Sequence, residues 1–162
     1  MSVKYFDSYT TKTQLKQIED LIKNESEHML QLDEEMIRDI INNYEAIIAL
    51  DGPKVIGFVK FFINSKEKDT NTEILELGSL VVEEKWRKCG IGKELVKRLV
   101  TKIKLRNPKS VLLGVVRKTN KVSYKFLKSI GGKEINKPKS MILYPLEWNE
   151  DKFYIIDLTN IC

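Results

Sequence analysis

Apolar residues recur along the chain at two spacings, and these separate helices from strands. A spacing of three to four residues predicts helices over residues 13–29, 33–41, 91–103 and 119–130. Short apolar or alternating runs predict strands over residues 3–9, 45–50, 55–63, 74–82 and 111–116, with further extended segments near 141–144 and 153–156. This order of elements predicts one α/β domain with a mixed sheet.

Several elements end in residues with a clear physical role. Asp33 can cap the helix over 33–41, in which Met36, Ile37, Ile40 and Ile41 are expected to face inward. Asp51-Gly52-Pro53-Lys54 is a strong turn signal between two apolar runs and predicts an antiparallel hairpin. Residues 64–71 are polar and charged, so we expect an exposed loop there. Gly131-Gly132 can end the last helix with a left-handed cap.

The helix that begins at residue 91 has the clearest amphipathic pattern. Its apolar stripe is Ile91, Leu95, Val96, Leu99, Val100 and Ile103, and Asn107-Pro108 ends it. No repeat, low-complexity segment or linker divides the chain. We therefore expect a single domain over residues 1–162.

Composition narrows the class of protein without naming a function. The charge is +5, from 28 basic and 23 acidic residues, and this excess suits a phosphate-bearing ligand or a nucleic acid. Glutamates lie between the lysines along the whole chain, which argues against a nucleic-acid surface. No run is long enough for a membrane span, and the N-terminus lacks a signal-peptide core. The two cysteines, Cys89 and Cys162, have no neighbours at metal-ligand spacing, so we expect a cytoplasmic protein without a metal.

The turn Arg87-Lys88-Cys89-Gly90-Ile91-Gly92 joins a strand to a helix that starts without a side-chain cap. Unpaired amides and the helix dipole at such a start form a site for a phosphate or pyrophosphate. Gly90 and Gly92 let a ligand approach the backbone, and Arg87, Lys88 and Lys93 add positive charge. A P-loop is excluded because Glu94 follows Gly92-Lys93, and a dinucleotide fingerprint lacks its third glycine. The alternative is that the glycines only relieve a tight turn.

The segment from Leu77 to Gly92 resembles motif A of GNAT acetyltransferases, an apolar strand followed by Arg/Gln-x-x-Gly-x-Gly/Ala. The segment from Asn120 to Gly132 resembles their motif B, in which Asn-x-x-Ala/Ser starts a helix. The resemblance implies a largely antiparallel sheet of six or seven strands, helices on both faces and a V-shaped opening for acetyl-CoA. The cofactor-binding residues that it implies, together with the turn, are Leu80, Val81, Val82, Arg87, Lys88, Cys89, Gly90, Ile91, Gly92, Lys93 and Asn120.

The resemblance also implies direct attack of an amine on the thioester. Glu76 precedes Arg87 by eleven positions, like the glutamate base of histone-acetylating members, and its apolar strand is expected to raise the pKa of its carboxyl. A solvated residue or an ion-pair partner is the competing interpretation, and Glu73 is the alternative base. Many members place an acid tyrosine seven residues after the motif B asparagine, but here that residue is Leu127. Tyr124 is the candidate acid; water and a packing role for Tyr124 remain alternatives.

Other conspicuous residues have weaker functional interpretations. His28 is expected at the surface. Asn120 has two competing interpretations, a hydrogen bond to the cofactor and a helix cap. An aromatic cluster could line an acceptor pocket or belong to the core; its members are Tyr144, Trp148, Phe153 and Tyr154.

The leading hypothesis is an N-acetyltransferase that uses acetyl-CoA and a primary amine. One alternative is a non-catalytic CoA-binding or regulatory domain, which Leu127 at the usual acid position favours. The other is a nucleic-acid-associated protein, which predicts salt-dependent binding. The acceptor, a small-molecule or protein amine, is left open, as is the acyl group beyond acetyl. Homodimers are common in the family, but the sequence shows no clear interface.

Overall fold

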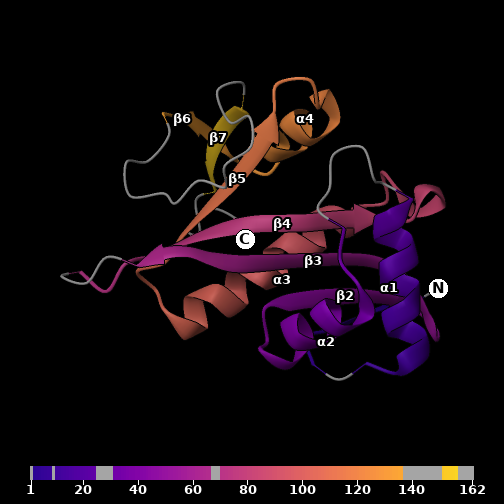
Figure 1. The fold of residues 1–162 in the computed structure, drawn as a ribbon. Coiled ribbons are helices and arrows are strands. Elements are labelled where there is room, and N and C mark those ends of the chain that lie inside the picture. The colour runs from indigo at the N-terminus through magenta and orange to yellow at the C-terminus, as the bar shows by residue number, and fades with distance from the viewer. Residues whose placement is uncertain (1, 9, 25–30, 67–69, 137–150, 157–162) are drawn as a thin grey trace. The chain divides into compact units, whose positions relative to one another are not determined.

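The hydrophobic pattern is realised in twelve elements of a computed structural model, which describes residues 2–8, 10–24, 31–66, 70–136 and 151–156 (Figure 1). They are β1 (Val3–Phe6), α1 (Lys12–Lys23), α2 (Glu34–Asn42), β2 (Ala46–Asp51), β3 (Lys54–Lys66), β4 (Glu73–Val82), the short 3-10 helix η1 (Glu84–Trp86), α3 (Ile91–Arg106), β5 (Val111–Arg117), α4 (Lys121–Ser129), β6 (Lys133–Ile135) and β7 (Asp151–Ile156). In the described part of the chain, no helix is long and apolar enough to cross a membrane.

The strands hydrogen-bond in the order β1-β2-β3-β4-β5-β7-β6. Pairs β1–β2, β2–β3, β5–β7 and β6–β7 are antiparallel, while β4–β5 is parallel. The predicted α/β fold with a mixed, largely antiparallel sheet is confirmed. The chain forms two compact units, residues 1–61 with 78–99 and residues 62–77 with 100–162. We call them unit 1 and unit 2; β3, β4 and α3 each contribute residues to both.

Unit 1 has helices on both faces of its strands. On one face, α1 and α2 bury Ile18, Ile22 and Ile37 against a cluster that includes Ile48 and Phe58, which are register partners. Gly57 lies on the other face because side chains alternate along a strand. A Cβ built at Gly57 would lie 3.0 Å from the Leu95 side chain, so α3 packs closely on this face.

The predicted helix signals are mostly confirmed. The Asp33 carboxylate accepts a hydrogen bond from the Met36 amide at 2.9 Å, as a cap should. All six residues of the α3 stripe are buried. The inward position of Met36 was wrong: its side chain is 51% exposed, because α2 has only nine residues and buries just Ile37 and Ile41 fully.

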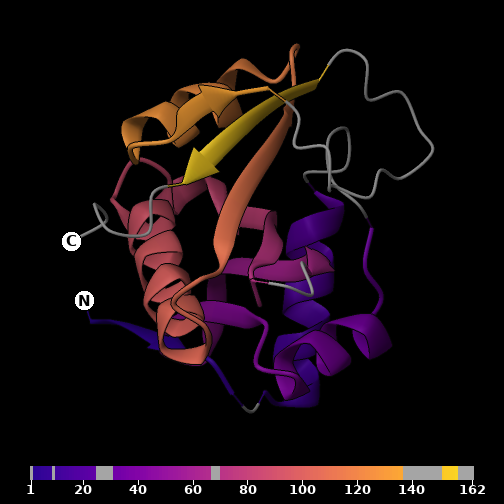
Figure 2. The same ribbon diagram turned by 90° about the vertical axis from the view of Figure 1, so that its left-hand side faces the viewer.

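Unit 2 is built on a parallel ladder that pairs Ile74–Leu77 of β4 with Val111–Gly114 of β5. One face of this sheet carries the apolar cluster of Ile74, Leu113 and Phe153. Helix α4 lies along the other face of β5 (Figure 2). Gly131, with φ of 86°, and a 2.8 Å bond from the Gly132 amide to the Leu127 carbonyl form the predicted cap of α4.

Two predicted boundaries differ from the structure. Strand β3 continues to Lys66, so Asn64 belongs to a strand and not to the predicted loop over 64–71. Strand β6 was not predicted, because three residues carry too little pattern. The strand predicted near 153–156 is β7, while the segment near 141–144 lies outside the described residues.

The contact of α4 with β5 leads to a stability prediction. A Cβ built at Gly114 would lie 2.6 Å from Leu127 Cδ1, closer than real Cβ contacts. We expect Gly114→Ala to lower the free energy of unfolding by about 1–3 kcal/mol through overpacking. Urea denaturation measures this change. In a Leu127→Ala background, which removes the clashing methyl groups, the same substitution should cost far less, and equal costs would contradict the contact.

Candidate active site

The turn before α3 presents a row of backbone amides. Lys88 and Gly90 have φ of 61° and 82°, so the chain changes direction twice within three residues. The first helical bond runs from the Glu94 amide to the Gly90 carbonyl at 3.0 Å. The amides of Ile91, Gly92 and Lys93 precede it, and no residue of the described chain accepts them. They are the free donors of a helix start, to which the dipole of a 16-residue helix adds partial positive charge.

The surroundings of this turn leave room for a ligand. Ile91 is buried and anchors the turn, whereas Lys88, Cys89 and Gly90 are exposed. A Cβ built at Gly90 meets no atom within 4 Å, so the space in front of the backbone is open. Arg87 Nε donates to the Val82 carbonyl at 3.0 Å, which ties the turn to the end of β4. The arrangement is suited to an anion held by backbone amides, such as a pyrophosphate.

The edge predicted for pantetheine, Leu80 to Val82, follows an irregular point in β4. Ser79 has φ of 48°, a left-handed conformation that is uncommon for a residue with a side chain. Val81 is buried among the residues that α1 and α2 cover, while Leu80 and Val82 are half-buried. The strand therefore changes its backbone direction just before the residues that the resemblance assigns to the cofactor.

Glu76, the predicted base, is buried, with 8% of its surface exposed. It is the register partner of Leu113, so it lies on the face of the sheet that carries Ile74 and Leu113. Asn64 Nδ2 donates to Glu76 Oε2 at 3.4 Å. Asn64 was not predicted as a site residue because it was assigned to the exposed loop over 64–71. The alternation of side chains along β3, which continues through Asn64, is the signal that could have identified it.

Glu73, the alternative base, has a structural role. Its carboxylate accepts from Arg106 Nη2 at 2.7 Å and from Ser110 Oγ at 3.2 Å, and it is buried. The Glu73 carboxylate thus joins β4, α3 and the residue before β5 within unit 2, and removing either charge of the pair would leave the other uncompensated. Glu73 is therefore an ion-pair partner of Arg106.

The two motif B residues also have structural neighbours. Asn120 Oδ1 accepts from the Ser123 amide at 3.1 Å, so the asparagine caps α4; its cofactor contact stays a prediction. Leu127 is buried and packs on Gly114, so the position of the usual acid tyrosine faces the core here.

Tyr124 is half-buried, one turn before Leu127. Its hydroxyl accepts from Lys128 Nζ at 2.7 Å, and its ring meets Tyr154 edge-on with centroids 5.9 Å apart. Tyr154 is fully buried and donates to Glu134 at 3.2 Å; burial, with the nearby Glu134 charge, raises its pKa to about 12. Tyr154 and Phe153 thus belong to the core, and Tyr144 and Trp148 lie outside the described residues, as does His28.

Glu76 and Tyr124 lie on opposite faces of the unit 2 sheet. Glu76 shares the face of its partner Leu113, whereas α4 covers the face of Gly114, the next residue. The ring of Tyr124 meets Tyr154, the register partner of Gly114, on that second face. The two side chains therefore do not contact each other. A ligand that meets both of them has to be reached by Glu76 from one face of the sheet and by Tyr124 from the other.

Comparison with known proteins is consistent with this fold. The chain superposes on a subunit in the NatC complex bound to Gag peptide and CoA (TM-score 0.71, 18% identity, 96% of each chain covered). It also superposes on an N-acetyltransferase from Staphylococcus aureus Mu50 (TM-score 0.71, 18% identity, 98% and 99% covered). Arabidopsis thaliana Naa50 with the bisubstrate analogue CoA-Ac-MVNAL gives a TM-score of 0.66 at 18% identity, with 96% and 97% covered.

No curated protein sequence matches the chain. The acetyltransferase (GNAT) family, in contrast, matches residues 12–131, which include the amide turn, Glu76 and all of α4. The chain therefore belongs to the acetyltransferase (GNAT) family.

Proposed function

We propose that the protein transfers an acetyl group from acetyl-CoA to a primary amine by direct attack in a ternary complex. The observation that carries this proposal is the row of free amides at residues 91–93, which directly follows Gly90, where a built Cβ meets no atom within 4 Å. These amides would hold the pyrophosphate of acetyl-CoA, and Lys88 and Lys93 would add charge. The edge from Leu80 to Val82 would hold the pantetheine arm. CoA bound in structures of similar fold supports this choice of donor.

In the proposed reaction, the amine nitrogen attacks the thioester carbonyl carbon and the carbonyl oxygen becomes an oxyanion. An amide of the β4 edge would donate to this oxyanion. Glu76 would take the proton from the attacking amine, directly or through water. Collapse of the intermediate breaks the C–S bond, and the CoA thiolate leaves. Tyr124 or a water would then protonate the thiolate. The O–H of Tyr124 donates to no group of the described chain.

The placement of the two side chains supports a division of labour. Glu76 and Tyr124 approach unit 2's sheet from opposite faces, and the β4–β5 ladder has its last pair at Leu77–Gly114. A thioester lying where this ladder ends would have the base on one side and the acid on the other. The base and the acid also act on different atoms, the attacking nitrogen and the leaving sulfur.

A thiol-release assay with acetyl-CoA and a mixed panel of amines tests the proposal. Amine-dependent release of CoA is the expected result, and the responding amine names the acceptor class. The second candidate is a non-catalytic CoA-binding domain, which Leu127 in the core favours because the usual acid position is lost. It predicts acetyl-CoA binding in calorimetry without release for any amine.

The role of Tyr124 can be measured separately. We expect Tyr124→Phe to lower kcat about tenfold, the low end for acid catalysis, since a thiolate is a weakly basic leaving group. The dissociation constant for acetyl-CoA should change little. Tyr44→Phe is the matched control, since Tyr44 is 58% exposed in unit 1. An unchanged kcat in Tyr124→Phe would assign the proton to water.

A further inference from the structure

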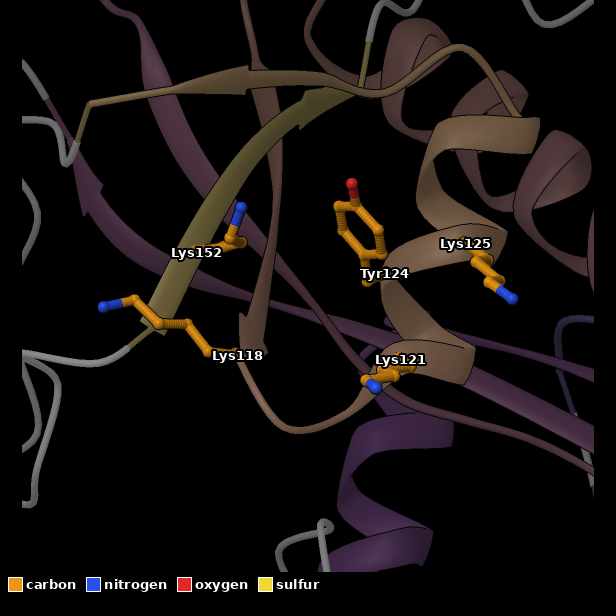
Figure 3. A pocket seen from close by; sticks show the side chains of 5 residues that line it. All are labelled: Lys118, Lys121, Tyr124, Lys125 and Lys152. Atoms are coloured by element: carbon orange, nitrogen blue, oxygen red, sulfur yellow. The ribbon is translucent and has the colours of Figure 1, made fainter.

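Unit 2 contains a cavity of about 280 Å³, and four of its five lining residues are lysines. Its walls are Lys118, Lys121, Tyr124, Lys125 and Lys152. Figure 3 shows three of these residues on α4, Lys118 at the end of β5 and Lys152 on β7, with Lys152 and Tyr124 facing each other. The volume is near the lower end of the range of small-molecule sites, roughly 300–1,000 Å³.

The charges around this cavity are poorly balanced. Lys152 pairs with Glu134 at 2.9 Å, and Lys128 adds a further ammonium at the Tyr124 hydroxyl. In the described part of the chain, Lys118, Lys121 and Lys125 have no ion-pair partner. Four lysines thus line the cavity, and the ion pair that the structure gives them is Lys152–Glu134; the side chains of Lys118 and Lys125 point away from each other (Figure 3).

The position of these lysines on α4 is unfavourable for the helix alone. Lys121 and Lys125 are one turn apart, so their charges repel. Lys121 also stands at the first position of a helix whose first turn has no acidic residue, where the dipole already supplies positive charge. An anion in the cavity would relieve both effects.

We propose that this cavity binds an anionic group, a phosphate or carboxylate, carried by one of the two ligands of the reaction. The identity of the carrier rests on the proposed function, since the donor CoA has a 3′-phosphate besides its pyrophosphate and an acceptor amine can carry a carboxylate or phosphate. The anion site itself rests on the cavity and its charges. Lys118, the residue after β5, and Lys121, the first residue of α4, would hold the ligand.

The first test uses inorganic phosphate, measured by calorimetry at low ionic strength, and needs no catalysis. The double variant Lys118→Gln/Lys121→Gln should weaken phosphate binding about tenfold or more, and salt should weaken it in the native protein. Lys12→Gln is the matched control, because Lys12, like Lys121, is an exposed lysine at the first position of a helix. No phosphate binding, or equal binding by native and double variant, would overturn the proposal.

The second test identifies the carrier. If the cavity holds the donor's 3′-phosphate, the double variant loses affinity for CoA but not for 3′-dephospho-CoA. If it holds the acceptor, the KM of the double variant rises for phosphoethanolamine or β-alanine but not for ethanolamine or propylamine. A protein that binds phosphate in this cavity but shows no affinity for acetyl-CoA would contradict the proposed function and leave the anion site standing.

Discussion

Replacing Glu76 with glutamine is expected to lower kcat for acetyl transfer about tenfold or more, because a general base contributes at least that much when the attacking amine must lose a proton. Glutamine has the same shape and can still accept from Asn64, which lies 3.4 Å from Glu76 Oε2. The buried site is therefore kept, and only the proton acceptor is removed. The measurement is thiol release with the responding amine at saturating acetyl-CoA.

The control for this variant is Glu84→Gln, since Glu84 is exposed in the short helix after β4. Its kcat should equal that of the native protein. Calorimetry should give Glu76→Gln the native affinity for acetyl-CoA, which separates a lost base from a damaged binding site. Near-native kcat in Glu76→Gln would remove Glu76 from the reaction and leave water or another group as the base.

The second large effect is expected at Gly90. We expect Gly90→Ala to weaken acetyl-CoA binding about tenfold or more, because the new methyl group would stand in the space where a phosphate approaches the amides. No atom of the described chain lies within 4 Å of a Cβ built at this position, so the methyl group itself clashes with nothing there. Calorimetric titration with acetyl-CoA measures the change.

The chain offers a matched control for the backbone strain of this substitution. Gly52, in the turn between β2 and β3, also has positive φ and also has no atom within 4 Å of a built Cβ. Gly52→Ala and Gly90→Ala should therefore cost similar stability, about 1 kcal/mol, in urea denaturation. Only Gly90→Ala should lose affinity for acetyl-CoA. Equal affinity in the two variants would mean that the glycines of the turn serve the backbone alone.

Local patterns were sufficient for much of the fold. The stripe from Ile91 to Ile103 identified α3 because a helix buries every third or fourth residue whatever it packs against. Asp33 and Gly131 identified helix ends because a cap bonds to its own helix, within a few residues. The amide turn was readable for the same reason: its donors and glycines are consecutive in the chain.

Less of the candidate site could be predicted from the sequence, since its contacts join segments that are distant in the chain. Asn64 reaches Glu76 only because β3 continues to Lys66, past residues whose polarity is typical of a loop. Glu73 and Glu76 look alike in sequence, and the ion pair with Arg106 distinguishes them. The lysines of the cavity come from the residue after β5, from α4 and from β7. Nothing in their spacing along the chain predicts that they line one cavity.

The sequence by itself determined the family, the order of most elements and the turn with free amides before α3, because each depends on residues close together in the chain. Only the tertiary structure decided that Leu127 fills the space over Gly114, that Glu76 and Tyr124 lie on opposite faces, and that a cationic cavity lies beside Tyr124. The physical reason is the period of two in a strand: pairing register sets which face a residue occupies, and register is a relation between segments that the local pattern of either one does not contain.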